Sequence, residues 1–186
     1  MNFPEDNIVI ALDPSGNYTE GKGTTGFAIS NNGYIYATGE IAAAEYPTQM
    51  SYWEAILNKI DKLRMKYHKI KVVCEDYRLY ASASEAQINS NLETPQLIGA
   101  IKYHCYEYKI PIIMQMAAEV KDRWSNEVLL AKGVLTEDAK KRKYIGRNRL
   151  GKHDIDAVRH LIHYNTFKAH PKKNSPPTPH FERAYY

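Results

Sequence analysis

Three acidic residues lie at or near the ends of predicted elements from which their side chains could meet at one point. Asp13 closes a five-residue apolar run, and Glu75 closes a three-residue apolar run. Asp156 lies in residues 153–160, which read as the start of a helix. A charge at the end of a buried strand is costly unless a partner offsets it. Because carboxylate oxygens suit magnesium or manganese, the three acids indicate a metal site of the kind that cleaves phosphodiesters.

The acidic helix leaves the choice of its metal ligand open. At about 100° per residue, His153 and Asp156 lie one turn apart on neighbouring faces and could share a metal environment. Asp154 lies about 160° from Asp156, so a regular helix cannot aim both at one ion. Asp154 suits the first helical turn, where a carboxylate complements exposed N–H groups. It would become the ligand if the apolar face that begins at Ala157 meets the sheet.

Each of these residues also has an ordinary structural explanation. Asp13 precedes Pro-Ser-Gly, a sequence in which aspartate commonly caps a turn. Glu75 could be an exposed strand end, and Asp76 is expected to be one. His160 and His163, later in the same helix, are expected to be structural or exposed rather than part of the site.

Basic residues are concentrated in the last third of the chain. Residues 121–186 carry 15 Lys or Arg against 7 Asp or Glu, whereas residues 1–120 carry 10 against 14. Directly before the acidic helix stand Lys140, Lys141, Arg142, Lys143, Arg147, Arg149 and Lys152. Such a cluster attracts phosphate and gives nucleic-acid affinity that depends on salt. The alternative is a solvated lysine-rich face, which is less favoured because the cluster adjoins the candidate metal ligands.

Length and composition are those of one domain of ordinary size. A chain of 186 residues with 44% apolar and 25% charged residues can form a sheet covered by helices. No signal-like start and no run of about 20 apolar residues is found, so we expect a cytoplasmic protein without a membrane segment. Cys74 and Cys105 lack metal-like spacing and are expected to be core residues of a reducing compartment.

Hydrophobic periodicity predicts a mixed α/β order. Strands are expected at residues 7–13, 26–30, 34–39, 71–75 and 111–115. Helices are expected at about 48–67, 94–108, 117–132 and 153–167, with a loop at 82–91. The first and fourth strands must be neighbours if Asp13 and Glu75 are to converge. Residues 1–167 are predicted to form the domain, and residues 168–186, with four prolines, a flexible basic tail.

Taken together, the motifs resemble RuvC-type Holliday-junction resolvases of the ribonuclease H-like superfamily. The resemblance rests on Asp13-Pro14, Thr25-Gly26-Phe27-Ala28-Ile29, Glu75 at a strand end, and His153-x-x-Asp156-Ala157. The segments at 75–78, 94–100 and 156–160 look closest to resolvases carried by bacteriophages. The resemblance spans roughly residues 7–165, and the order and spacing of the motifs carry it rather than any one of them.

The resemblance implies a ribonuclease H-like mixed five-stranded sheet flanked by helices. It also implies two Mg²⁺ ions, for which Mn²⁺ could substitute, bound by Asp13, Glu75, His153 and Asp156. Asp13 would bridge both ions. His153 stands where many relatives have aspartate, and it could bind a metal or assist proton transfer. The motif match favours Asp156 over Asp154 as the ligand.

Further residues acquire expected roles from the same resemblance. Lys121 would lie near the scissile backbone. Tyr77 and Tyr80 would stack on bases unpaired at a junction centre, or else pack at the surface. Residues 17–23 are an insertion relative to the family pattern and could reach DNA or a partner.

The expected function is cleavage of four-way DNA junctions by a homodimer, in the host cytoplasm if the protein is phage-encoded. A junction offers two symmetric strands, which suits a C2 dimer. Gly99 and Ala100 make the helix at 94–108 the candidate interface. The main alternative is a less selective nuclease for branched DNA or RNA–DNA hybrids. An actin- or sugar-kinase-like ATPase would need a longer chain, and a non-enzymatic DNA-binding module has no use for three convergent carboxylates.

Overall fold

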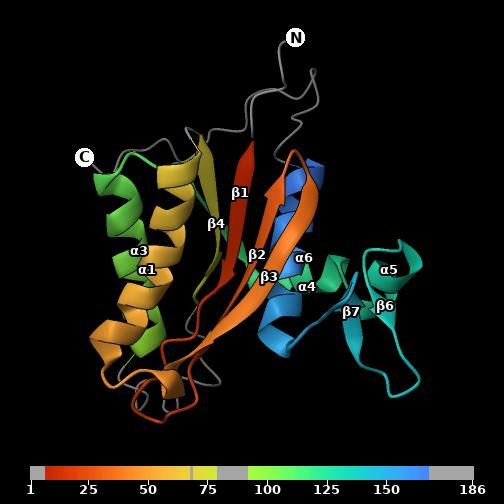
Figure 1. The fold of residues 1–186 in the computed structure, drawn as a ribbon, viewed down its shortest axis with the longest axis horizontal. Helices are drawn as coiled ribbons and strands as arrows, with labels where there is room; N and C mark the ends of the chain where they lie inside the picture. The colour runs from red at the N-terminus through yellow and green to blue at the C-terminus, as the bar shows by residue number, and fades with distance from the viewer. Residues whose placement is uncertain (1–6, 68, 79–91, 168–186) are drawn as a thin grey trace.

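A five-stranded mixed sheet forms the centre of the protein (Figure 1). The computed structural model describes residues 7–67, 69–78 and 92–167. The sheet consists of β1 (Ile8–Asp13), β2 (Thr24–Asn31), β3 (Tyr34–Ala42), β4 (Ile70–Asp76) and β5 (Ile112–Met116). Their order across the sheet is β3-β2-β1-β4-β5. The pairs β1–β2 and β2–β3 are antiparallel, whereas β1–β4 and β4–β5 are parallel. The predicted α/β class and the adjacency of the first and fourth strands are therefore confirmed.

Helices cover both faces of this sheet. The long helices are α1 (Gln49–Lys66), α3 (Glu93–Glu107) and α6 (Lys152–Phe167), with a short 3₁₀ turn, η1 (Ala43–Glu45), before α1. Figure 1 shows α1 and α3 side by side on one face and α6 on the other. Ile8, Ile10 and Leu12 pack towards α1 and α3, while the alternate residues Val9 and Ala11 pack against α6. Burial on both faces explains why β1 is a continuous apolar run rather than an alternating one.

The predicted helix at 117–132 is wrong in one respect, because the chain breaks it into two. These are α4 (Ala117–Arg123) and α5 (Asn126–Ala131). Ser125 lies between them, and its Oγ accepts a hydrogen bond from the N–H of Val128, which caps α5. Trp124 is buried in a small cluster with Leu129, Leu135 and Leu150. Burial of this indole at the break and the serine cap outweigh the continuous helical pattern.

The basic segment forms a second, three-stranded sheet. It contains β6 (Thr136–Glu137), β7 (Lys143–Ile145) and β8 (Asn148–Arg149), in the order β6-β7-β8. Gly146, at φ 58°, makes the tight turn between β7 and β8. In Figure 1 this sheet and α5 lie beside α6. The basic residues are thus presented by a folded hairpin.

Several expectations concern parts of the chain outside the described residues. Tyr80, the loop at 82–91 and the tail at 168–186 fall there. No helix within the described ranges is long and apolar enough to span a bilayer.

Candidate active site

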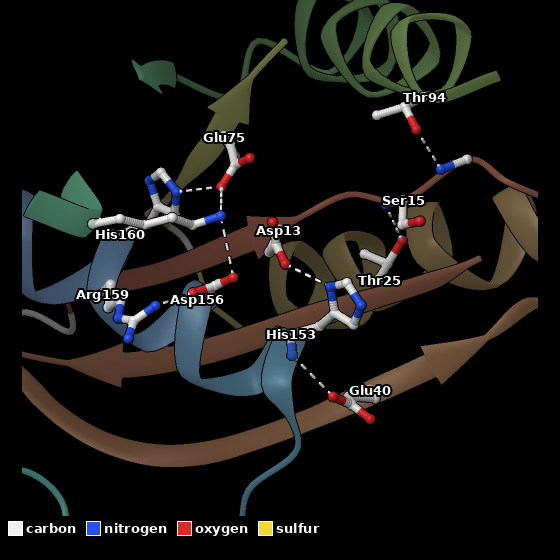
Figure 2. Close-up of polar contacts among 12 residues, drawn as sticks. Asp13, Ser15, Thr25, Glu40, Glu75, Thr94, His153, Asp156, Arg159 and His160 are labelled. Atoms are coloured by element: carbon white, nitrogen blue, oxygen red, sulfur yellow. Dashed lines mark hydrogen bonds and ion pairs between the residues drawn. The ribbon is translucent and has the colours of Figure 1, made fainter. Parts of the chain in front are cut away.

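Parallel pairing of β1 with β4 brings two of the predicted acids to one edge of the sheet. Leu12 pairs with Cys74, so Asp13 and Glu75 follow at neighbouring strand ends. Figure 2 shows the first turns of α6 crossing this edge, with His153 and Asp156 turned towards the strand ends. The sheet order thus supplies the convergence that the three acids need to form one site.

The start of α6 is anchored by a side chain of the sheet. Glu40 of β3 accepts a hydrogen bond from the backbone N–H of His153 at 3.1 Å. A carboxylate at this position complements the exposed N–H groups of the first helical turn. This contact fixes the backbone of His153 over the sheet (Figure 2).

Asp13 is buried and pairs with His153. The residue is 5% exposed, and its Oδ2 lies 2.8 Å from His153 Nδ1. Burial raises the pKa of Asp13, the hydrogen bond from His153 opposes that rise, and the charges of Glu75 and Asp156 add to it. The hydrogen bond to Asp13 in turn raises the pKa of His153. Burial is therefore the largest effect on the pKa of Asp13, and the two neighbouring acids reinforce it.

Lys121 of α4 joins the other two acids. Its Nζ lies 3.4 Å from Glu75 Oε2 and 3.2 Å from Asp156 Oδ2. Burial alone would raise the pKa of Glu75, but the hydrogen bond from His160 and the charge of Lys121 lower it overall. Burial would lower the pKa of Lys121, but Glu75 and Asp156 raise it. Lys121 is therefore a charged counter-ion inside the acidic cluster.

Asp156, rather than Asp154, shares Lys121 with Glu75. The apolar face that begins at Ala157 does meet the sheet, and Asp154 nevertheless bonds to the start of its own helix. Asp154 lies in the first turn, where its Oδ2 accepts a hydrogen bond from the N–H of Gly151 at 3.0 Å. Asp154 therefore caps the start of the helix, as its position in the first turn predicts.

Arg159 forms a second partner for Asp156. Its Nη1 pairs with Asp156 Oδ1, and its Nη2 donates to Asn126 Oδ1 at 2.9 Å. Asn126 belongs to α5, so this guanidinium links the acidic cluster to the segment that precedes the small sheet.

His160 lies beside Glu75 and is not exposed, so of the two expected outcomes, structural or exposed, the structure supports the structural one. It is fully buried, and its Nε2 lies 2.9 Å from Glu75 Oε2. Its Nδ1 lies 2.9 Å from Oε1 of Gln115, a residue that the sequence pattern did not single out either. A signal was present, because His153, Asp156 and His160 follow the i, i+3, i+7 spacing of one helical stripe.

A basic hollow of about 490 Å³ opens beside Asp156. It lies between α5, the β7–β8 hairpin and the start of α6. Its cationic lining consists of Lys141, Arg142, Lys143, Arg149, Lys152 and Arg159. Arg142 pairs with Asp138, and Lys143 pairs with Glu137. The two remaining predicted DNA-binding cations, Lys140 and Arg147, are exposed but do not line this hollow.

Tyr77 and the insertion at 17–23 both contact other parts of the described chain. Tyr77 is partly buried and packs against the core cluster that includes residues of α1 and α3. The insertion at 17–23 rests on α3, where Glu93 Oε2 accepts the N–H of Thr19 at 3.2 Å. Tyr52 donates to the carbonyl of Ser15 at 2.7 Å and so braces the turn that follows Asp13.

The donor chemistry of this cluster fits a hard divalent cation. No three His, Cys, Asp or Glu side chains among the described residues are arranged to hold an ion as they stand. Each acid is instead balanced by a protein partner, with His153 beside Asp13 and Lys121 between Glu75 and Asp156. Three carboxylates and an imidazole are nevertheless suitable ligands for magnesium or manganese. Burial, with the charges of Glu75 and Asp156 adding, raises the pKa of Asp13, and a bound cation would offset both effects.

The fold of this chain is similar to that of RuvC of Thermus thermophilus. The structure "T. thermophilus RuvC in complex with Holliday junction substrate" matches with a TM-score of 0.58 and 14% identity, covering 85% of this chain and 92% of that one. A second Thermus thermophilus RuvC structure matches with a TM-score of 0.54 and 15% identity, covering 85% and 93%. No protein-family model matches the chain, and no curated protein matches it by sequence. The chain has a RuvC-like, ribonuclease H-like α/β fold.

Proposed function

We propose that this protein is a metal-dependent endonuclease that cuts four-way DNA junctions. One observation carries the proposal: three carboxylates and a histidine meet at one edge of a RuvC-like sheet, directly beside a basic hollow. The solved relative bound to a Holliday junction supports the choice of substrate. The bacteriophage-like motifs support a resolvase that acts in the cytoplasm of an infected cell.

Four residues would hold the metal: Asp13, Glu75, His153 and Asp156. Two Mg²⁺ ions, or Mn²⁺ in their place, supply an activated water and stabilise the leaving oxygen when bound. His153 uses Nδ1 to bind Asp13, which leaves Nε2 as the atom that can bind a metal or move a proton. Lys121 presents a cation beside Glu75 and Asp156, where it would contact the scissile phosphate.

The basic hollow would hold the DNA strand rather than perform chemistry. Its lysines and arginines offer sequence-independent contacts to phosphate oxygens. Because Asp156 also lines the hollow, a DNA strand held in the hollow would reach the acidic cluster.

A symmetric dimer would match the two equivalent strands of a junction. Gly99, on α3, is exposed and lies on the face of the sheet opposite α6. An interface through α3 would therefore leave both acidic clusters uncovered.

The test compares substrates under defined metal conditions. A four-way junction, a linear duplex and an RNA–DNA hybrid are each incubated with Mg²⁺, with Mn²⁺ or with EDTA. We expect junction cleavage with either ion and none with EDTA. Equal cleavage of all three substrates would support the less selective nuclease, and cleavage undiminished by EDTA would refute the metal site.

A further inference from the structure

Glu75 is held by a buried chain of polar side chains in addition to Lys121. His160 is 0% exposed and places one ring nitrogen 2.9 Å from Glu75 and the other 2.9 Å from Gln115. Figure 2 shows the imidazole of His160 between α6 and the end of β4. Gln115 is itself buried at the carboxyl end of β5.

The backbone sets the spacing of this chain of side chains. Glu75 and Gln115 are register partners on the parallel strands β4 and β5, so their side chains leave the same face of the sheet. His160 reaches them from α6, which packs on that face. Two strands and one helix therefore define the position of the ring.

The chemistry of the partners determines what the ring does. An ionised carboxylate can only accept a hydrogen bond, so His160 Nε2 must carry the proton that faces Glu75. The other nitrogen either donates to Gln115 Oε1 or accepts from its NH₂ group after a half-turn of the amide. The Nε2 of Gln115 is buried without a partner among the described residues in the present orientation. In both arrangements the Nε2–H of His160 donates to Glu75.

The hydrogen bond from His160 acts on one oxygen of Glu75. His160 and Lys121 both approach Oε2, at 2.9 Å and 3.4 Å. Both nitrogen donors therefore engage the same oxygen of Glu75. The two donors thus hold the carboxylate in one orientation at the end of β4.

We propose that His160 is a positioning residue for Glu75, with Gln115 setting the orientation of its ring. This inference rests on the proposed function, in which Glu75 binds a divalent cation. Groups that orient a metal ligand in this way commonly contribute about 10- to 100-fold to metal affinity or activity.

Two amide substitutions of His160 form a matched pair for the test. The side-chain nitrogen of glutamine lies near the position of Nε2, so His160→Gln retains a donor to Glu75. Asparagine reaches only the position of Nδ1, so His160→Asn retains the hydrogen bond with Gln115 and removes the one with Glu75. Both variants remove the ring, and their thermal unfolding shows whether the packing cost is the same.

Mn²⁺ affinity is measured by titration calorimetry without DNA, and junction cleavage is measured separately. We expect His160→Asn to lose about 10- to 100-fold in Mn²⁺ affinity and to lower kcat with little change in KM. His160→Gln should stay within a few-fold of the wild type. Wild-type Mn²⁺ affinity in both variants, or equal loss in both, would overturn the proposal.

Two further variants complete the experiment. Gln115→Met keeps the length of the side chain and removes its hydrogen-bonding groups, so it should weaken Mn²⁺ binding several-fold if the ring needs that anchor. This variant tests the same chain of side chains if substitution of His160 prevents folding, and unchanged affinity would then refute the proposal. Glu75→Gln distinguishes failure of the proposed metal site from failure of the positioning role of His160. Normal Mn²⁺ binding by Glu75→Gln would refute the metal site. Loss of Mn²⁺ binding in Glu75→Gln together with normal binding by His160→Asn would refute only the positioning role.

Discussion

Gly26 of β2 lies against the backbone of His153. A Cβ atom at Gly26 would come within 2.1 Å of the carbonyl oxygen of His153 and 2.2 Å of its carbonyl carbon. Both atoms are backbone, so neither can turn aside as a flexible side chain would. The missing side chain at Gly26 lets α6 rest closely on the sheet, and this places the His153 ring on Asp13.

Gly26→Ala should therefore disturb the site through its geometry. We expect the added methyl group to push the start of α6 from the sheet, at a cost of roughly 1–3 kcal/mol in the free energy of unfolding. Cleavage should fall further than stability alone accounts for, because His153 moves with the helix. Urea unfolding and junction cleavage provide the measurements. Gly99→Ala is the control for urea unfolding, since a Cβ there meets nothing within 4 Å. An equal free energy of unfolding in the two variants would contradict the proposed role of Gly26.

Asp13→Asn should abolish cleavage but leave junction binding nearly intact. The substitution removes a charged ligand from the acidic cluster, whereas the phosphate-binding side chains of the basic hollow remain. Loss of a metal ligand should cost several kcal/mol in the transition state, or at least about 100-fold in rate. Gel-shift titration in EDTA measures binding, and cleavage is followed with Mg²⁺. A rate within about tenfold of the wild type would remove Asp13 from the proposed site.

The same substitution should affect stability in a direction that depends on pH. Burial, with Glu75 and Asp156 adding, raises the pKa of Asp13 above 3.8. The folded state then binds the proton of Asp13 more tightly than the unfolded state does. The resulting contribution to the free energy of unfolding is present below pH 3.8 and is lost as pH rises through the folded pKa. Metal-free Asp13→Asn should accordingly be more stable than the wild type near pH 7, with a difference that shrinks in acid.

Glu75→Gln is the control, because its effect on stability at neutral pH should have the opposite sign to that of Asp13→Asn. Despite burial, the hydrogen bond from His160 and the charge of Lys121 lower the pKa of Glu75 below 4.5. The contribution of Glu75 to the free energy of unfolding is therefore present above pH 4.5 and is lost as pH falls through the folded pKa. Glu75→Gln should be less stable than the wild type at neutral pH. Urea unfolding in EDTA from about pH 3.5 to 7 checks both signs, and parallel curves for the two variants would contradict them.

Cations of the basic hollow should control DNA affinity and its response to salt. Lys141, Arg149 and Lys152 line the hollow, and the structure gives them no ion pair within the described residues. Replacing all three by alanine should weaken junction binding and reduce the salt slope by about one for each phosphate that the variant no longer binds. The wider replacement of Lys140–Lys143 should also weaken binding, but it removes Arg142 and Lys143, whose ion pairs with Asp138 and Glu137 lie in and beside the small sheet.

Lys62→Ala is the control for charge alone. Lys62 is exposed on α1, on the face of the sheet away from α6. Its replacement should change the salt slope little. An unchanged slope in the triple variant would mean that the hollow is only a solvated basic surface.

Gly99→Leu tests the dimer that paired cutting requires. The position is exposed, and a Cβ there meets no neighbour within 4 Å, so the fold should tolerate the change. If α3 forms the interface, the variant should become monomeric and nick junctions slowly at unpaired positions, because each chain keeps its own acids. Sedimentation and mapping of the cut sites measure this. A wild-type monomer that cuts linear duplex equally well would leave a nuclease and exclude the resolvase.

The amino-acid pattern alone predicted the five strands of the large sheet and the three long helices, together with three acids that could meet. The unbroken apolar run before Asp13 predicted a buried strand, and the structure confirms it. The i, i+3 spacing of His153 and Asp156 placed them one turn apart on neighbouring faces of a helix, and in the structure both turn towards the strand ends. These features are local, because hydrophobic periodicity and helical geometry act over a few residues.

Only the tertiary structure decided which distant groups meet. Glu75 and His160 are 85 residues apart, and their hydrogen bond exists because β1 and β4 pair in parallel while α6 crosses their ends. Likewise, the continuous pattern at 117–132 does not show that Trp124 is buried at a break, nor that the basic segment folds into a sheet. Periodicity reports which side of an element is buried. The partner of each buried polar group depends on strand order and register, which are set by packing between distant segments of the chain.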